Sequence, residues 1–440
     1  MYLIYNILLL LSAIFLVPYY GLKILFTGKY RKSVGPKLGM IPAAIFDGMT
    51  GQPRIWVHAV SVGEVTAAAP IVSSLRDLFP QAFIVLSTST ETGQEMAKRI
   101  VPAATCRIYY PLDIPCVVRK MIRRVMPDIF VPVETEIWPN FIKICRDAGI
   151  RIVMVNGRIS PRSFKRYRMT RFFWKEVLEM VDGIGVISEV DAERLRTIGV
   201  HPSRIRILGN AKFDSLAARV DPALRNEIAR ILNVQEGEKV FVAGSTHEGE
   251  EEIVFRVYRK ILERYPSFKL IIVPRHIERV QDVLAMARQR GLSDVITMTE
   301  IRGGKRPLDE RVIIIDVIGE LFKVYGLATV VFCGGSLVPR GGQNILEAAA
   351  WGKVVFYGPS MEDFMDEKAL LEEAGAGIQV KDADELYKGM KEFLNDPEAL
   401  MGKGEAARAS VSANMGASKR YAALIRETLI NAGKGQKAKG

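Results

Sequence analysis

The sequence contains few of the residues from which metal sites and disulfide frameworks are built. Its 440 residues include only four histidines and four cysteines. No histidine belongs to an HxH or HExxH motif, and no two cysteines form a CxxC pair. We therefore predict no metal site, no disulfide framework and no resident cofactor. The cysteines are interpreted as buried thiols in a reducing compartment.

Several nucleotide-binding and nucleophile motifs are also missing. The chain has no Walker loop, no GxGxxG fingerprint and no Ser/His/Asp arrangement around a nucleophile elbow. One Asp-x-Asp does occur, at Asp382 and Asp384, but it opens the amphipathic pattern DADELYKGMKEFL. We interpret it as a helix cap and not as a metal motif.

Charge is absent from the start of the chain, where Lys23 is the first charged residue. The mostly apolar stretch is long enough for a membrane span, which needs about 20 residues. Lys23, Lys29, Arg31 and further basic residues follow, whereas a cleaved signal peptide carries its basic residues first. We predict an uncleaved single-pass anchor over residues 1–28 with a cytoplasmic body. The alternative is an amphipathic or core helix.

The rest of the chain is globular in composition and strongly basic. It is 49% hydrophobic and 25% charged, with a formal net charge of +12. An excess of positive charge indicates an acidic partner, which could be nucleic acid, anionic lipid or a phosphorylated substrate. The length is too great for one ordinary core, so two domains are expected.

Strand-like and helix-like runs alternate along the body, which predicts a mostly parallel sheet in each domain. The first series is RIWVHAV, AFIVLSTS, CRIYYPL, DIFVPVE, RIVMVN and GIGVIS, and the second is KVFVAGS, FKLIIVPR, VITMT, RVIIID, ATVVFCGGS, KVVFYGP and GIQVK. We place one Rossmann-like doubly wound domain at 29–210, a second at 211–432 and a disordered basic tail at 433–440. In such sheets ligands bind at the carboxyl ends of the strands.

The second domain contains a glycine-rich turn in the segment ATVVFCGGSLVPRGGQNILEAAAWGKVVFYGP. Four glycines would let a ligand approach the backbone closely. A helix beginning near Gln343 and Asn344 would direct N–H groups at a phosphate, and Glu347 could accept both hydroxyls of a ribose. The alternative is a tight turn with no ligand.

Two more loops should converge on the same sheet edge. Arg275 ends the run IIVPRH, where a guanidinium could bind phosphate, and Gly319, Glu320 and Leu321 follow the run IIID. Helix capping explains either loop alone, whereas the loops together favour binding.

The first domain offers carboxylates after its strands. Glu64 follows RIWVHAVSVG at a predicted strand-to-helix turn, where it could cap the helix or accept a proton. Glu134 and Glu136 follow the strand VPVE, which favours a bound polar group or proton transfer. Lys212 lies in GNAKFD, at the predicted interdomain linker.

A basic segment with interspersed aromatic residues covers 158–175, RISPRSFKRYRMTRFFWK. Such a segment can stack nucleic-acid bases or lie on anionic lipid. Because an anchor is predicted on the same chain, we favour lipid over nucleic acid. The residues assigned to this patch are Arg162, Lys165, Arg166, Arg168 and Arg171.

Seven motifs, in this order, resemble those of the 3-deoxy-D-manno-octulosonic acid (Kdo) transferases of lipopolysaccharide assembly. They are HAVSVGE, VETEIWPN, GNAKFD, AGSTHEGEE, VPRH, IGEL and GGSLVPRGGQNILEAAAWG. The resemblance implies the GT-B type of glycosyltransferase fold. It also implies an inverting transfer of Kdo from CMP-Kdo to a lipid A precursor disaccharide, without metal, at the cytoplasmic face of the inner membrane.

The same resemblance implies roles for individual residues. It makes Glu64 the general base and makes Glu134 and Lys212 the groups that stabilise the transition state. The implied CMP contacts are Pro274, Arg275, Gly319, Glu320, Leu321, Asn344, Ile345, Leu346 and Glu347. Two positions depart from the family pattern, because Gln343 replaces a frequent His and Asp363 replaces a frequent Asn.

Three other functions remain open at this point. A glycolipid glycosyltransferase that uses a UDP-sugar would share most features. A soluble nucleotide-sugar epimerase on the same fold would not explain the apolar N-terminus or the basic patch. A non-enzymatic lipid- or nucleic-acid-binding protein would leave the loop motifs without a role.

Overall fold

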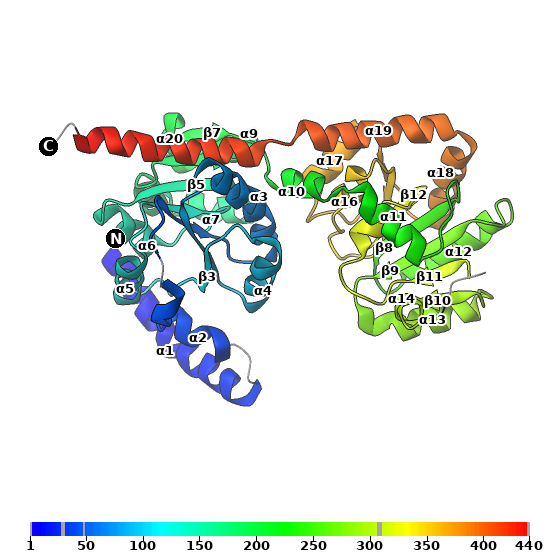
Figure 1. Cartoon of the computed structure of the whole chain (residues 1–440), viewed down its shortest axis with the longest axis horizontal. Helices are drawn as coiled ribbons and strands as arrows, with labels where there is room; N and C mark the ends of the chain where they lie inside the picture. Colours follow the sequence, from blue (N-terminus) through cyan, green and yellow to red (C-terminus); the bar gives the residue numbers. More distant parts are fainter. Residues whose placement is uncertain (1, 28–30, 47–48, 306–309, 438–440) are drawn as a thin grey trace. The chain divides into compact units, whose positions relative to one another are not determined.

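The computed structural model describes residues 2–27, 31–46, 49–305 and 310–437. The chain forms two compact units (Figure 1). Unit 1 is Met1–Ser215 with Asn414–Gly440, and unit 2 is Leu216–Ala413. Each unit contains one seven-stranded sheet in which every pairing is parallel. The prediction of two doubly wound α/β domains is confirmed.

The sheet of unit 1 has the strand order β3-β2-β1-β4-β5-β6-β7. The chain runs outward from β1 to β3 on one side and from β4 to β7 on the other, so the direction of winding changes between β1 and β4. The strands are β1 (Arg54–His58), β2 (Phe83–Thr88), β3 (Cys106–Tyr109), β4 (Ile129–Pro132), β5 (Arg151–Gly157), β6 (Gly183–Val186) and β7 (Ile205–Ile207). The sequence pattern missed β7, a three-residue edge strand without a buried side chain.

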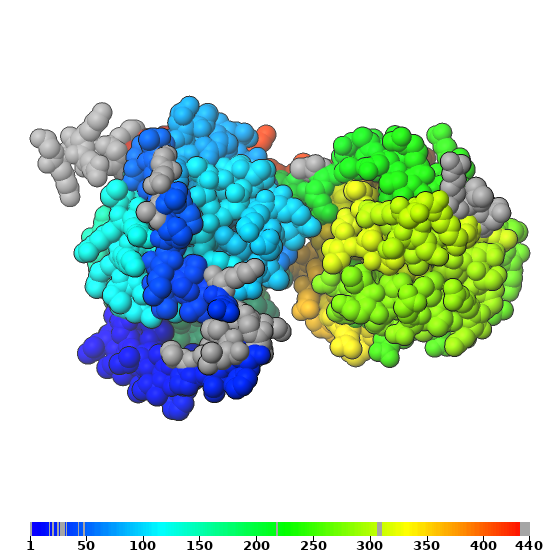
Figure 2. Space-filling view, turned by 60° about the horizontal axis from the view of Figure 1, so that its bottom comes forward, coloured from blue at the N-terminus to red at the C-terminus, as the bar shows by residue number. Residues whose placement is uncertain are grey.

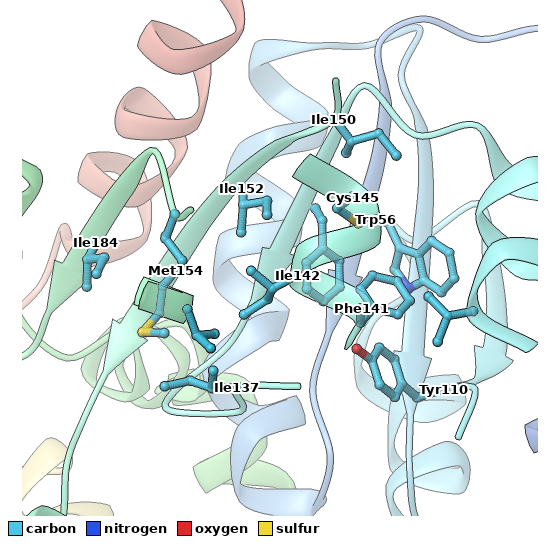
Figure 3. Close-up of a cluster of buried hydrophobic side chains, with 14 of the residues drawn as sticks. Trp56, Tyr110, Ile137, Phe141, Ile142, Cys145, Ile150, Ile152, Met154 and Ile184 are labelled. Carbon is cyan, nitrogen blue, oxygen red and sulfur yellow. The ribbon is translucent and has the colours of Figure 1, made fainter. Parts of the chain in front are cut away.

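Two hydrophobic clusters cover the two faces of this sheet. Trp56 belongs to one cluster, whereas its neighbours Ile55 and Val57 belong to the other, as the period of two in a strand requires. Figure 3 shows Trp56, Tyr110 and Phe141 in the first cluster, where the rings of Trp56 and Phe141 meet edge to face at 5.1 Å. Because both faces are covered, the strands are apolar along nearly their whole length.

Helices connect the strands of unit 1 in sequence order. They are α3 (Val62–Leu78), α4 (Glu91–Ile100), α5 (Pro115–Val125), α6 (Pro139–Asp147), α7 (Pro161–Met169), α8 (Arg171–Leu178) and α9 (Glu189–Ile198), followed after β7 by α10 (Lys212–Arg219).

Unit 2 has the strand order β10-β11-β9-β8-β12-β13-β14, with its change of winding between β8 and β12. The strands are β8 (Val240–Thr246), β9 (Lys269–Pro274), β10 (Val295–Thr297), β11 (Val312–Ile314), β12 (Val330–Cys333), β13 (Val355–Tyr357) and β14 (Gly377–Gln379). The helices are α11 (Pro222–Ile231), α12 (Glu250–Leu262), α13 (Val280–Gln289), α14 (Met298–Arg302), α15 (Leu321–Tyr325), α16 (Leu346–Ala350), α17 (Met365–Glu373), α18 (Ala383–Asn395) and α19 (Pro397–Ala413). Asp382 caps α18 by accepting the N–H groups of Asp384 and Glu385, as predicted.

The N-terminal segment forms α1 (Tyr2–Thr27) and α2 (Arg31–Lys37). Over the described parts of the chain, no helix combines the length and the apolar character that crossing a membrane requires. The predicted spanning anchor is therefore not confirmed, and its last residue, 28, lies outside the described residues.

The C-terminal helix corrects the predicted domain boundaries. We assigned residues up to 432 to the second domain, but α20 (Ala417–Lys437) packs on α3, β5 and β6 of unit 1. Tyr421, Ala422 and Ile425 are fully buried in the cluster that covers one face of its sheet. The predicted disordered tail is also wrong for 433–437, which continue α20, while 438–440 lie outside the described residues.

This packing predicts that one aromatic side chain on the last helix stabilises unit 1. Tyr421 is fully buried, and its hydroxyl donates to the carbonyl of Gly209 at 2.7 Å. Replacing a buried aromatic residue by alanine typically costs about 3–5 kcal/mol, so Tyr421→Ala should lower the free energy of unfolding by that amount in urea denaturation. Ile430→Ala is the control on the same helix, because Ile430 is 51% exposed. Equal stability of the two variants would contradict the placement of α20.

Candidate active site

Glu64 lies where the winding of the unit 1 sheet changes direction. It occupies the first turn of α3, just after β1, while Glu134 and Glu136 follow β4. Strands β1 and β4 are parallel neighbours, with His58 beside Pro132 in register. The three carboxylates therefore leave the same edge of the sheet at its switch point, where open α/β sheets bind ligands.

The carboxylate of Glu64 is buried and turned back toward its own helix start. It accepts the N–H of Val60 and, at 3.2 Å, the hydroxyl of Ser61. Only 9% of the residue is exposed. The pKa of Glu64 is raised to about 7, chiefly by burial and also by the nearby Glu136 and Glu134, against the bonds from Val60 and Ser61, which lower it. Glu64 thus ties the first turn of α3 to the residues just before it, and its raised pKa lies near neutral pH.

Glu134 and Lys212 form an ion pair beside this carboxylate. The ammonium of Lys212 donates to Oε1 of Glu134 at 2.9 Å. Glu134 has a φ of 60°, in the left-handed region that a residue with a Cβ adopts only at a cost of about 1–3 kcal/mol. Its backbone N–H donates to the carbonyl of Val155 on β5, which holds it in that conformation. The fold thus maintains strain at a residue that follows a central strand.

Two asparagines of this site, Asn156 and Asn210, were not predicted, and Glu136 was named without a role of its own. Asn156, which also has a positive φ of 52°, accepts the N–H of Ala211, and Asn210 accepts the N–H of Lys212. These two amides fix the start of α10 and hence the position of Lys212. Burial raises the pKa of Glu136, and its charge acts on Glu64. The spacing in VETEIW indicated Glu136, but nothing in the sequence pattern singled out the asparagines.

The glycine-rich turn of unit 2 already contains a carboxylate of the protein. Glu250, which is fully buried at the start of α12, accepts the N–H groups of His247, Gly335, Ser336 and Leu337 at 2.7–3.0 Å. These amides are therefore satisfied internally and are not free for a ligand phosphate. Gly334 is explained by packing, because a Cβ there would lie 2.5 Å from the carbonyl oxygen of Ser245.

The second glycine pair of this turn lies beside Asp363, one of the two positions that depart from the family pattern. Gly341 and Gly342 both have a φ of 81°. The N–H of Gly341 donates to the Ser360 hydroxyl at 2.9 Å, and the N–H of Asp363 donates to the carbonyl of Gly341 at 3.1 Å. A Cβ at Gly341 would lie 2.5 Å from a carboxylate oxygen of Asp363. These contacts tie 341–342 to the 358–364 loop.

The predicted donor loops do end at one edge of the unit 2 sheet. Pro274 closes β9 and is buried, whereas Arg275 is exposed, and its N–H donates to the carbonyl of Thr246 at 3.0 Å. Arg275 has no carboxylate partner among the residues that the structure describes. Its guanidinium is therefore available to an anion.

The side chain of Glu320, one of the implied CMP contacts, is paired within the protein. Its carboxylate is bound by Arg302 at 2.9 Å and by Lys323 at 3.1 Å. The neighbouring Gly319 has a φ of 98°, and Leu321 begins α15. The 319–321 turn thus presents its backbone, because the carboxylate is occupied within the protein.

The helix that follows the glycine-rich turn begins later than predicted, at Leu346. Asn344 accepts the N–H of Leu346 at 3.1 Å, and Ile345 is fully buried. Glu347 accepts a bond from Arg219 at 3.3 Å, and the Arg219 guanidinium lies 4.0 Å above the ring of Phe322. Burial raises the pKa of Glu347, which Arg219 partly opposes. Of the four residues, Glu347 is the one with a carboxylate placed to accept hydroxyl groups.

Histidine has a structural role near Glu64. His58 is fully buried and its ring stacks on Tyr110 at 3.6 Å, and burial lowers its pKa to about 3.

Within the described residues, no group of three or more His, Cys, Asp or Glu side chains could hold a metal ion. A cavity of about 320 Å³ in unit 2, lined by Thr329, Trp351, Lys353 and residues of α19, includes none of the predicted donor residues.

The basic patch predicted on 158–175 is exposed on α7 and α8. Arg162, Lys165, Arg166, Arg168 and Arg171 are all exposed. Its aromatic residues differ from the prediction, since Phe164, Tyr167, Phe173 and Trp174 pack partly into the unit 1 core. Phe172, at 65% exposure, is the aromatic side chain of the patch that faces outward. Base stacking by a row of aromatic residues is therefore not supported.

Residues 32–215 match the family model described as 3-Deoxy-D-manno-octulosonic-acid transferase (kdotransferase). The 3-deoxy-D-manno-octulosonic acid transferase of Haemophilus influenzae is 30% identical over 427 residues, which cover 97% of this chain and 98% of that protein. A bifunctional glycosyltransferase/methyltransferase of Fusobacterium nucleatum is 31% identical over 353 residues, or 80% of this chain. The match covers 54% of that relative, so this chain spans about half its length.

A solved structure of UDP-GlcNAc 2-epimerase from Neisseria meningitidis, bound to UDP-GlcNAc, shares the fold. It matches 86% of this chain and 100% of its own chain with a TM-score of 0.59. The sequence identity is 13%, so the likeness concerns the fold alone.

The raised pKa of Glu64 predicts a pH-dependent cost to stability. The folded protein retains a proton up to about pH 7 that the unfolded chain releases near the ordinary value of 4.5. The contribution of Glu64 to stability therefore falls as the pH rises from 4.5 through 7, by up to about 3 kcal/mol. Glu64→Gln should gain stability relative to the wild type by that amount between pH 4.5 and pH 8, measured by denaturation at each pH. Glu189→Gln, at the exposed start of α9, is the control, and parallel pH profiles for Glu64→Gln and the wild type would refute the shift.

Proposed function

This chain belongs to the 3-deoxy-D-manno-octulosonic acid transferase family and is a glycosyltransferase, and we propose that it transfers Kdo from CMP-Kdo to a lipid A precursor disaccharide. The observation that carries the proposal is Glu64, a buried carboxylate at the sheet switch point whose pKa burial raises to about 7. A base with a pKa near the working pH is efficient in proton transfer.

The proposed reaction is an inverting displacement. A hydroxyl oxygen of the acceptor forms a bond to the anomeric carbon of Kdo while its proton passes to the carboxylate of Glu64. The bond between that carbon and the CMP phosphate oxygen breaks, and its electron pair leaves with CMP. The Ser61 hydroxyl and the N–H of Val60 hold the Glu64 carboxylate in place. To accept the proton, this carboxylate must also direct one oxygen lone pair at the acceptor hydroxyl.

Glu134 and Lys212 are proposed to stabilise the charges that develop in the transition state. The anomeric carbon gains oxocarbenium character, which an anionic carboxylate stabilises, and the Kdo carboxylate and the leaving phosphate are anions that an ammonium stabilises. The 2.9 Å ion pair supplies both signs in one fixed group. Asn156 and Asn210 act as positioning residues, since they hold the backbone at Ala211 and Lys212.

The donor nucleotide is assigned to the sheet edge of unit 2. Arg275 is exposed and without a carboxylate partner among the described residues, so it is proposed to bind the phosphate. Glu347 is proposed to accept ribose hydroxyls, and the 319–321 turn to contact the base or ribose through its backbone. Pro274, Asn344, Ile345 and Leu346 shape the two turns that present Arg275 and Glu347.

We further propose that the enzyme works without a metal ion and associates with the cytoplasmic face of the inner membrane. A reaction without metal requires that cationic side chains of the protein bind the anionic groups of CMP-Kdo. Membrane association is supported by the apolar α1 and by the exposed cations of α7 and α8. Both features suit an acceptor that is itself an anionic lipid.

A donor screen distinguishes this function from a transferase that uses a UDP-sugar. The purified protein is incubated with detergent-dispersed lipid A precursor and either CMP-Kdo or a UDP-sugar, and mass analysis of the product identifies and counts the added sugars. We expect transfer from CMP-Kdo only, and undiminished transfer after EDTA treatment. Transfer from a UDP-sugar would replace the donor assignment. Activity lost in EDTA and restored by Mg²⁺ would overturn the metal-free mechanism.

Glu64→Gln tests the base directly. Glutamine keeps the shape and can accept the bonds from Val60 and Ser61, but it cannot take the acceptor proton. General-base catalysis typically contributes 10²–10⁴-fold, so transfer should fall at least about a hundredfold while CMP binding is unchanged. The wild-type rate should rise with pH and level off above about 7, as expected for a base that must be ionised. A variant that retains more than about a tenth of wild-type turnover would leave Glu64 as a helix cap.

Arg275→Ala and Glu347→Ala test the donor site. A hydrogen bond to a charged group contributes roughly 1.5–3 kcal/mol, so each variant should bind CMP about ten- to a hundredfold more weakly by calorimetry. Arg290→Ala is the matched control, because Arg290 is an exposed arginine that pairs with Glu252 on α12. Wild-type affinity in both test variants would move the nucleotide elsewhere.

A further inference from the structure

The first turns of α1 are attached to the body of unit 1 by polar contacts. The hydroxyl of Tyr5 donates to Asp113 at 2.9 Å. The amides of Asn6 and Asn140 exchange two hydrogen bonds, at 2.7 and 3.2 Å. We call these four residues the α1 latch. It joins the start of α1 to the loop before α5 and to the first turn of α6.

The partners of the latch are fixed within unit 1. Asp113 and Asn140 are only 3% and 4% exposed. Asp113 also accepts the N–H groups of Asn140 and Phe141, and the Asn140 amide donates to the carbonyl of Asp113. The rings of Tyr2 and Tyr5 lie 6.1 and 5.9 Å from the ring of Phe173 on α8. The latch therefore belongs to a packed and hydrogen-bonded surface.

The helix that follows α1 in the chain is also attached to unit 1. Ser33 on α2 is buried, and the carbonyl of Lys37 accepts the N–H of Leu112, which neighbours Asp113. The start of α1 and the next helix along the chain therefore both lie against the same unit.

Large apolar side chains are exposed along the length of α1. Between 47% and 83% of each of these residues is exposed: Leu3, Ile4, Ile7, Leu8, Leu10, Leu11, Ile14, Phe15, Leu16, Tyr19, Leu22 and Phe26. In Figure 2 this segment, in dark blue, lies at the surface of unit 1. Lys23, Arg31 and Lys37 follow with no acidic residue among the first 46. An apolar face in a segment whose formal charge is positive is complementary to an anionic lipid surface.

We propose that α1 lies along the surface of an anionic membrane with both of its ends on the side of the protein body, and that the α1 latch fixes it there. This inference rests on the membrane association proposed above but is independent of the sugar donor. If α1 crossed the hydrocarbon core, its start would lie about 30 Å from the body. Tyr5 and Asn6 would then lose Asp113 and Asn140.

Cross-linking in membranes tests the latch. In the full chain with Cys116→Ser, the pair Asn6→Cys and Asn140→Cys is treated with a short bis-maleimide in sealed membrane vesicles that expose the body. We expect an intramolecular cross-link in the membrane-bound protein. Leu16→Cys with Asn140→Cys is the control, since residue 16 lies about 15 Å further along the helix. A cross-link in the control but not in the test pair would overturn the proposal.

A second measurement does not depend on the latch variants. A cysteine placed ahead of Met1 is labelled with a membrane-impermeant maleimide in the same vesicles, and the exposed Cys116 of α5 reports the side of the body. We expect both cysteines to react together. Labelling of the added cysteine only after the vesicles are opened would show a crossing helix. A protein that leaves the vesicles and dimerises through α1 would show that the apolar face of α1 binds a second copy of the chain and not lipid. CMP binding is measured separately, and its loss would count against the proposed function alone.

Discussion

The parallel pairing of β1 with β4 is the constraint on which the chemistry of unit 1 depends. Because helices before and after this pair pass on opposite sides of the sheet, the carboxyl ends of the two strands are left uncovered. Glu64 and Glu134 occupy that gap, one at a helix start and one in a left-handed turn. Burial, together with the nearby Glu136 and Glu134, raises the pKa of Glu64 to about 7, so the sheet topology places a carboxylate that titrates near neutral pH at this edge.

The unit 2 sheet is also parallel and has a switch point, but its strand order differs and another group lies at that point. There Glu250 follows β8 and binds the amides after β12, so an internal anion stabilises the turn. Glu250 accepts four backbone N–H groups, so these amides are not free to bind an external anion. A buried carboxylate thus lies at the switch point of each sheet, and in unit 2 it is engaged by the backbone of the protein itself.

The sequence pattern predicted the alternation of strands and helices, the two domains and the main carboxylates, because apolar periodicity and residue type are local properties. It missed β7, which has no buried side chain, and it missed Asn156 and Asn210, whose roles arise from backbone contacts. The side-chain state of Glu320 depends on Arg302, 18 residues away, and the burial of α20 on contacts more than 200 residues distant. Such long-range pairings have no signature in a local window.

The packing of α20 on unit 1 affects the order in which the cores of the two units can be completed during synthesis. Unit 2 is continuous from Leu216 to Ala413, so all of its residues are synthesised before α20 emerges. Unit 1 begins first, but one face of its sheet lacks Tyr421, Ala422 and Ile425 until the end of synthesis. The later unit can therefore complete its core first, and the earlier one leaves the apolar surface around α3, β5 and β6 without its last helix throughout translation, a surface that chaperones recognise.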